Sequence, residues 1–246
     1  MTATSTYARL EVLRTFRNVR FFIFSLVFPL TMYLLFAAPN RHDDDFLGSG
    51  LSAPLYYMVG LIAFGTMTAV IAGGARIAAE RSVGWNRQMR LTPLPARRYL
   101  RVKVATGYLM AGVSIVLLYG AGIALGVRMP LDRWAEMTAL ILVALVPFAV
   151  MGIALGHMLS VDSMGPALGG ITALFAFLGG SWFPITGDGV LARLAHVIPS
   201  YWLVQAAHVG TGGRAWGAEG WLVVAVWSAA LAAVAARAYR RDTARV

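Results

Sequence analysis

The sequence predicts an all-α membrane protein with six transmembrane helices. Three observations predict it: a high apolar content, six long uncharged runs, and a one-sided distribution of basic residues. Apolar residues make up 59% of the 246 residues and charged residues only 13%, whereas a soluble domain has about 45–50% and about 25%. One soluble core could not bury so much apolar surface, so we expect lipid to surround the chain.

Six uncharged runs are candidates for membrane-spanning helices, because a helix needs roughly 20 apolar residues to cross about 30 Å of hydrocarbon. These runs are residues 21–38, 51–75, 104–127, 137–158, 163–187 and 221–236. The first run is longer than the apolar part of a typical signal peptide, and Pro39 follows it where cleavage would be needed. We therefore expect it to remain as a span, in a single transmembrane domain that covers residues 1–246.

Basic residues are concentrated in the connections on one side of these spans. Residues 1–20, 76–103 and 237–246 carry four, eight and four Lys or Arg, against five on the other side. Because cytoplasmic connections keep an excess of Lys and Arg, both termini are predicted to be cytoplasmic. This distribution explains the net charge of +10 without a nucleic-acid partner, since the basic residues form no continuous face.

Residues 76–103 form the longest predicted cytoplasmic connection and are too polar to enter the membrane. We expect the helix of the second span to continue into them until the prolines of residues 91–95 end it, and a second basic helix to lead into the third span. Topology alone does not require Trp85, Met89 and Leu91 here. We interpret this elbow as a docking surface for a partner; a loop that contacts only lipid phosphates is the alternative.

Residues 188–220 form a long outer connection that is largely apolar. Gly and Pro divide it into two short helical segments, 190–198 and 201–209, each too short to cross the membrane. We predict that both enter the outer leaflet and return, with their broken backbone covered by protein. A solvated loop with two surface helices is the alternative.

Ionisable residues are missing from the predicted spans, which contain no Asp, Glu, Lys or Arg. Pumps and ion-coupled carriers keep such a residue in the membrane as a coupling site. Only His157 could serve, and we interpret it as a satisfied or interfacial histidine. An ion-driven carrier is therefore disfavoured.

Residue types needed for catalysis are also missing. The chain has no cysteine, which excludes disulfides and thiolate sites. Its only lysine, Lys103, does not follow the glycines that an ATP-binding P-loop requires, and no two of the four histidines have a metal-ligand i, i+4 spacing. We expect neither an enzyme nor a bound metal or cofactor.

Small residues recur at a spacing that allows helices to approach closely. Residues 122–126 and 152–156 have the same sequence, Gly-Ile-Ala-Leu-Gly, and Gly165 precedes Gly169 by four residues. Such pairs place glycine on one helix face, so we interpret all three as packing surfaces between spans.

Several of these segments together resemble the membrane subunit of an ATP-binding-cassette (ABC) transporter, of the type-2 permease family of exporters. The matching residues are Glu80-x3-Gly84, the turn Leu91-Thr92-Pro93-Leu94, Lys103, the run Gly179-Gly180-Ser-Trp-Phe183-Pro184-Ile185, and Val197-Ile198-Pro199-Ser200-Tyr201-Trp202. The resemblance covers essentially the whole chain, in the same order and on the same sides.

The resemblance implies partners that supply the missing chemistry. It implies two copies of a separate ABC ATPase subunit, which bind the ATP and Mg²⁺, and a second permease subunit, most simply in a homodimer. It implies an interfacial helix over residues 5–20, whose partly amphipathic face includes Val12, Phe16 and Val19, beside a coupling helix at residues 76–90 that sits in a groove of the ATPase. Membrane lipid is the remaining partner.

The resemblance also implies roles for three groups of residues. The residues expected to couple to the ATPase are Arg76, Glu80, Gly84, Trp85, Arg87 and Arg90. The residues expected to line a substrate path between spans two and five, where packing is the alternative role, are Tyr57, Leu61, Phe64, Thr68, Thr172, Phe175 and Gly179. The residues expected in the re-entrant segment are Phe183, Pro184, Pro199 and Tyr201.

These expectations combine into one function. An uncharged path rich in Met and aromatic residues suits a lipophilic drug, an antibiotic or a lipid-like molecule, which an ATPase-driven permease would export across a bacterial plasma membrane. A membrane scaffold or immunity protein that binds a partner without transport is the alternative.

Overall fold

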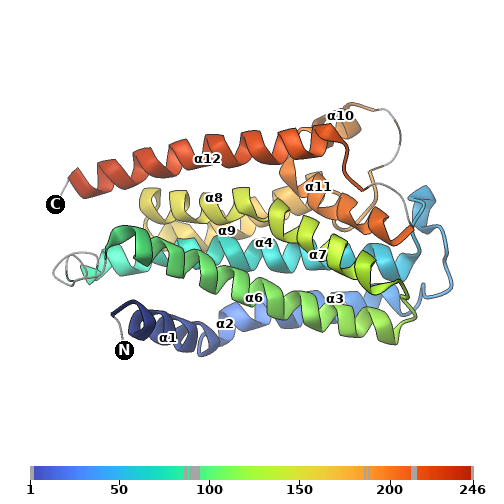
Figure 1. Cartoon of the computed structure of the whole chain (residues 1–246), viewed down its shortest axis with the longest axis horizontal. Helices are drawn as coiled ribbons and strands as arrows, with labels where there is room; N and C mark the ends of the chain where they lie inside the picture. The colour runs from blue at the N-terminus through green and yellow to red at the C-terminus, as the bar shows by residue number, and fades with distance from the viewer. Residues whose placement is uncertain are drawn as a thin grey trace.

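The computed structural model describes residues 3–85, 88, 95–185, 187, 189–211 and 215–244, and these residues are mostly helical. Figure 1 shows the long helices lying side by side along the longest axis of the molecule. Among the described residues, five helices are long and apolar enough to cross a membrane: Ala53–Ser82, Arg97–Ala124, Leu131–Met158, Val161–Leu178 and Ala218–Asp242. The chain therefore has the all-helical, multi-span architecture that its composition predicts.

The first predicted span is shorter and less regular than the others. It consists of α2 (Val19–Phe22), a π-helical turn η1 (Ile23–Val27) and α3 (Phe28–Ala37), and its apolar helical part is Ile23–Ala37. Pro29 has no N–H group that could donate to the carbonyl four residues earlier. The residue before it, Phe28, donates its N–H to the Ile23 carbonyl five residues earlier, which is the hydrogen bond of a π-helical turn. A sixth crossing by this segment stays a prediction.

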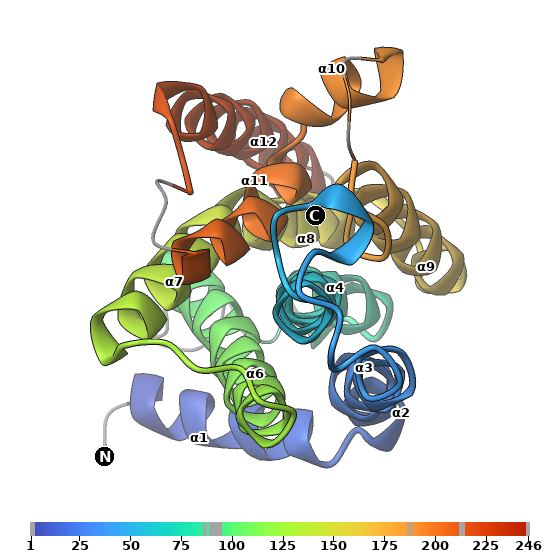
Figure 2. The same ribbon diagram turned by 90° about the vertical axis from the view of Figure 1, so that its right-hand side faces the viewer.

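The N-terminal helix α1 (Ala3–Phe16) ends before the predicted residue 20. Figure 2 shows it lying across the bundle beside α6. Glu11 and Thr15 on its inner side are buried, whereas Leu10, Leu13 and Phe16 are exposed. Arg9 and Arg14 are exposed beside these apolar side chains, so the exposed side is only partly apolar, and its position on a membrane surface stays a prediction.

The second predicted span is the centre of the fold. Helix α4 (Ala53–Ser82) contacts α3, α6, α8 and α9, and 83% of its apolar window is buried. A 3₁₀ turn, η2 (Phe46–Gly48), precedes it. Since every neighbouring span packs on α4, a movement of its end would reach most of the bundle.

Glycines bring α4 into backbone contact with α8. A Cβ added at Gly74 would lie closer than 3.0 Å to backbone atoms of Gly152, and one added at Gly156 would meet Gly74 as closely. The predicted packing role of residues 152–156 is thus confirmed. Gly165 and Gly169, in contrast, have open space around their Cβ positions, so the same prediction is wrong for them within this chain.

The remaining helices begin and end at residues that differ from the predicted span boundaries. Helix α6 (Ala96–Ala124) and helix α12 (Ala218–Ala244) extend past the uncharged runs into basic sequence. The fourth span is two helices, α7 (Leu131–Ala144) and α8 (Val146–Met158), separated just before Pro147. Helix α9 (Val161–Leu178) ends well before residue 187, because Gly180 adopts a φ of +74° that favours glycine.

Two short helices precede α12, as predicted: α10 (Val190–His196) and α11 (Pro199–Gln205), which the 3₁₀ helix η3 (Ala206–Thr211) follows. Indole N–H groups fix them, since Trp202 Nε1 donates to the His196 carbonyl at 2.8 Å and Trp216 Nε1 donates to the Trp202 carbonyl at 2.7 Å. Their entry into a leaflet stays a prediction.

The two ends of the bundle differ in composition. Figure 1 shows both termini at one end, together with the last turns of α4 and α8 and the first turns of α6 and α9. We call it the terminal end. The described parts of the three segments rich in Lys and Arg lie there. Basic residues that are far apart in the sequence are therefore gathered at one end of the folded bundle.

Candidate functional site

The predicted elbow begins at the terminal end of α4. The helix ends at Ser82, and Gly84 follows with a φ of +71°, a conformation that side chains rarely adopt. Trp85 is then 38% exposed. Arg87, Arg90 and the predicted turn at 91–94 lie outside the described residues.

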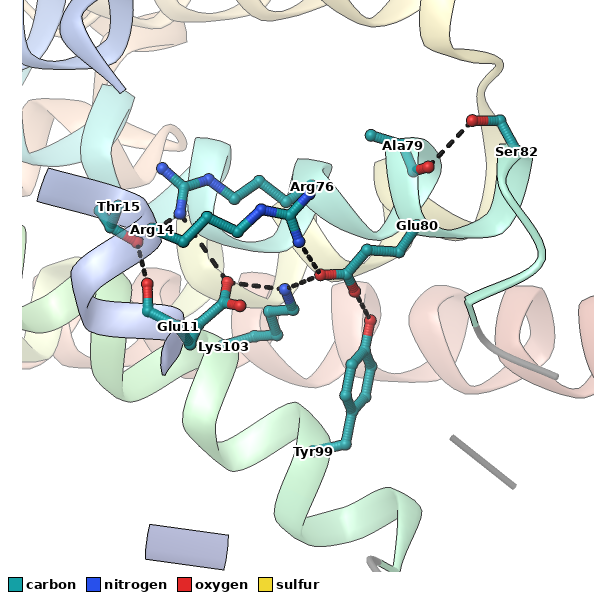
Figure 3. Close-up of polar contacts among 9 residues, drawn as sticks. All are labelled: Glu11, Arg14, Thr15, Arg76, Ala79, Glu80, Ser82, Tyr99 and Lys103. Carbon is teal, nitrogen blue, oxygen red and sulfur yellow. Dashed lines mark hydrogen bonds and ion pairs between the residues drawn. The ribbon is translucent and has the colours of Figure 1, made fainter. Parts of the chain in front are cut away.

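Glu80 lies on the last turns of α4, and its side chain points into the protein. Its Oε1 accepts a hydrogen bond from Lys103 Nζ at 2.5 Å, and its Oε2 accepts one from the Tyr99 hydroxyl (Figure 3). Lys103 Nζ also donates to Glu11 Oε1 at 2.7 Å. One buried ammonium group is therefore shared by two buried carboxylates.

Two arginines complete this group of charges. Arg76 Nη1 lies 3.8 Å from Glu11 Oε1 and donates to the Thr15 hydroxyl, and Arg14 Nη1 lies 3.4 Å from Glu80 Oε1. Arg14 is largely exposed, whereas the side chains of Lys103, Glu80 and Glu11 are 0–3% exposed. We call Glu11, Arg14, Arg76, Glu80, Tyr99 and Lys103 the buried ion cluster.

The buried ion cluster joins three helices. Glu11 comes from α1, Glu80 from α4 and Lys103 from α6, and Figure 3 shows their side chains meeting between the three. The Tyr7 ring packs against the Tyr99 ring with centroids 5.8 Å apart, and burial, assisted by the Glu80 carboxylate, raises the pKa of Tyr7. Ions removed from water are stabilised only by close partners, so the cluster fixes α1 against the ends of α4 and α6.

A second group of charges holds the opposite side of the same turn of α4. Arg81 donates through Nε to Asp242 Oδ1 at 2.9 Å and through Nη1 to the carbonyls of Gly156 and Leu159 at 3.2 and 3.4 Å. His157 Nδ1 lies 2.9 Å from Asp242 Oδ2, so one of the two ring nitrogens is satisfied, as the interpretation of His157 expects. We call Arg81, His157 and Asp242 the C-terminal triad, because Asp242 lies near the end of α12.

The sequence alone indicates only part of these two groups of charges. Glu80, Arg76 and Lys103 were singled out, although as partner-facing or family-matching residues and not as members of one buried group. Glu11, Arg14 and Tyr99 of the buried ion cluster were missed, as were Arg81 and Asp242 of the C-terminal triad. One signal was present: Glu11 is the only acidic residue before Asp43, in a segment that is otherwise basic and apolar.

The predicted substrate-path residues on α4 differ in burial and in their neighbours. Leu61 is fully buried, and Tyr57 stacks on Phe36 with centroids 5.6 Å apart. Phe64 and Thr68 are half-buried, and Phe64 lies against Trp182 with ring centroids 5.8 Å apart. Of the four predicted path residues on α4, Phe64 and Thr68 are thus the two that keep an open side.

The α9 members of the predicted path are mostly enclosed. Thr172 is buried, and Phe175 packs edge to face on Phe148 with centroids 5.2 Å apart. A Cβ on Gly179 would lie closer than 3.0 Å to the Ser200 side chain. Within a single chain these residues serve packing, the role that the sequence left open.

The predicted re-entrant residues surround small cavities at the end opposite the termini. Phe183 is exposed and Pro184 half-buried, and both line a cavity of about 340 Å³ together with Phe177 and Trp182. Pro184 and Tyr201 line a second cavity of about 170 Å³. Pro199 is buried at the start of α11. Across the described ranges, no three His, Asp or Glu side chains are placed to hold a metal ion.

Comparisons with known proteins agree with this arrangement. Residues 47–236 match the family model described as ABC-2 family transporter protein. YvfS of Bacillus subtilis (strain 168), a protein named as a transport permease, is 28% identical over 207 residues, which cover 82% of this chain and 80% of YvfS. The family match runs from η2 into α12, and so includes four of the five candidate spans in full and most of the fifth.

Proposed function

The chain belongs to the ABC-2 family of transporter membrane proteins, and on that premise we propose that it is the permease subunit of an ATP-driven exporter. As a member of this family it is a multi-pass membrane protein, in bacteria of the plasma membrane. Two copies would pair with two copies of a separate ATPase subunit, which would bind ATP and Mg²⁺ and supply the energy.

The observation that carries this proposal is the position of the buried ion cluster directly before the elbow. Trp85 and Gly84 would meet the ATPase, while Glu80, one turn earlier, holds Lys103 on α6 and through it Glu11 on α1. A force applied to the elbow would therefore move three helices together. In this proposal Glu80 and Arg76 position the elbow from inside and do not touch the ATPase.

The proposed substrate is lipophilic. Phe64 and Thr68 on α4 would face the second permease copy, and the cavity between Phe177, Trp182 and Phe183 lies towards the opposite end of the same side. Its volume of about 340 Å³ is in the range of sites for small molecules, which are mostly apolar. A lipophilic drug, an antibiotic or a lipid-like molecule would fit such a path.

Co-expression with the ATPase subunit tests the proposal. Trp85→Ala should reduce permease-stimulated ATP hydrolysis and efflux thirtyfold or more, because truncating an aromatic anchor at an interface costs about 2 kcal/mol or more. Leu131→Ala is the matched control, since Leu131 is exposed at the other end of the bundle, and it should leave both activities unchanged.

The same experiment separates the proposal from a scaffold. A scaffold would bind its partner without raising ATP hydrolysis, and Trp85→Ala would then change neither hydrolysis nor efflux. Efflux by the chain in the absence of any ATPase subunit would contradict the proposal as well.

A further inference from the structure

A basic cleft lies at the terminal end, away from the buried ion cluster. It has a volume of about 360 Å³ and opens between the end of α8 and the last turns of α12, beside Arg81 of α4. Arg237 and Arg241 of α12 line it as well. We call it the α8–α12 cleft.

The charges of the cleft do not cancel. Arg81 is neutralised by Asp242, with its Nη2 2.8 Å from Asp242 Oδ1. Arg237 and Arg241 are exposed, and within the described part of the chain their guanidinium groups form no ion pair or hydrogen bond. They are four residues apart, so they lie on one face of α12 and can reach the same anion.

A buried polar atom in the cleft wall also lacks a partner. His157 lines the cleft with a side chain that is 2% exposed, and its Nδ1 is occupied by Asp242. Its Nε2 is buried and has no hydrogen-bond partner in the described residues. The cleft therefore offers an anion two free guanidinium groups, while the His157 ring forms part of its wall.

The depth of the cleft is that of lipid headgroups. Arg237 is the first charged residue after the apolar run 221–236, and such a residue marks the membrane–water interface. Met158, Val234 and Ala238 form the apolar part of the lining, and Val234, one turn before Arg237, is on the membrane side of the arginines. A ligand with an anionic group and a hydrocarbon chain would match both parts.

We propose that the α8–α12 cleft binds the phosphate group of an anionic phospholipid from the leaflet at the terminal end. Arg237 and Arg241 donate to the phosphate oxygens, and an acyl chain lies along α12 past Val234. Basic pockets between membrane helices on the cytoplasmic side are suited to anionic headgroups. A free phosphate ion shares the chemistry of the arginines but gains nothing from the apolar part. This site is independent of the exported substrate.

Lipid titrations of the full chain in neutral detergent, followed by native mass spectrometry, test the site. Wild type should bind phosphatidylglycerol more tightly than phosphatidylcholine. The double change R237Q/R241Q should weaken phosphatidylglycerol binding about tenfold or more, the expected result of losing charge-assisted hydrogen bonds. R237K/R241K, which keeps the charge, should retain most of the binding.

A matched control is available on α6. R97Q/R101Q removes the same charge with the same spacing from exposed positions at the same end, and it should leave phosphatidylglycerol binding unchanged. Equal loss in this control would show general surface attraction and overturn the proposal. So would equal affinity for phosphatidylcholine, or full displacement of phosphatidylglycerol by millimolar inorganic phosphate, which would identify a free-anion site.

A second variant protects the test from misfolding. Should R237Q/R241Q yield no folded protein, Arg241→Gln alone is used, since Arg241 is exposed and no described contact depends on it. A several-fold loss of phosphatidylglycerol binding in this variant supports the site, and unchanged binding overturns it.

Discussion

Glu80 and Arg81 are neighbours in the sequence, yet they enter two charge clusters of opposite character. Glu11, Glu80 and Lys103 of the buried ion cluster are almost inaccessible, whereas Arg81 and Asp242 of the C-terminal triad are 28% and 17% exposed. Consecutive helix residues point about 100° apart, so one turn of α4 is fixed to α1 and α6 on one side and to α8 and α12 on the other. Because its charges are more deeply buried, we expect the attachment of α4 to α1 and α6 to be more rigid than its attachment to α8 and α12.

The largest expected effect is that of Lys103→Met, which leaves the Glu11 and Glu80 carboxylates buried without their shared cation. Removing one member of a buried ion group costs about 3–5 kcal/mol of folding free energy. We expect a strong fall in the apparent melting temperature in detergent and in the yield of folded protein. Arg101→Met, at an exposed position on the same helix, should change neither, and equal effects would refute the difference between buried and exposed charges.

Asp242→Asn should have an intermediate effect. It removes the charge that Arg81 and His157 share, but Arg81 keeps its hydrogen bonds to the Gly156 and Leu159 carbonyls. Partial exposure weakens the lost interaction, so we expect about 1–2 kcal/mol of destabilisation, measured in the same thermal assay. High salt should shrink the difference from wild type, because accessible pairs are screened. A loss as large as that of Lys103→Met would mean that the triad is as rigid as the buried ion cluster.

Arg133→Gln should have the smallest effect. Arg133 pairs with Glu136 at 3.2 Å at the end opposite the termini, and both side chains are more than one third exposed. Exposed pairs contribute little, so we expect at most about 0.5 kcal/mol and a melting temperature close to that of wild type. A clear loss of stability would show that the exposure of the charged side chains does not determine the order of these three effects.

The sequence predicted the elements of the fold better than their contacts. Long apolar runs determine which residues lie in the membrane, so the helices centred on residues 51–75, 104–127 and 221–236 were predicted. The early end of α9 was missed because residues 179–185 are apolar although Gly180 adopts a positive φ. The break between α7 and α8 was missed because Pro147 lies inside a run that is uniformly apolar.

The buried ion cluster could not be predicted in full for a different reason. Hydropathy gives the depth of a residue in the membrane but not the direction in which its side chain points around the helix. Glu11 and Lys103 are 92 positions apart, and only the packing of α1 against α6 brings them together. The sequence therefore identified Glu80 as important but predicted that it faces the partner, whereas its side chain points into the protein.

The contact between α4 and α8 has a consequence for how this chain can change in evolution. When a side chain grows in most cores, a neighbouring side chain can shrink to make room. At Gly74 the neighbour is the backbone of Gly152, which no substitution can make smaller. Any larger residue at either position must push the two helices apart, so both glycines can vary only together with a rearrangement of the whole bundle.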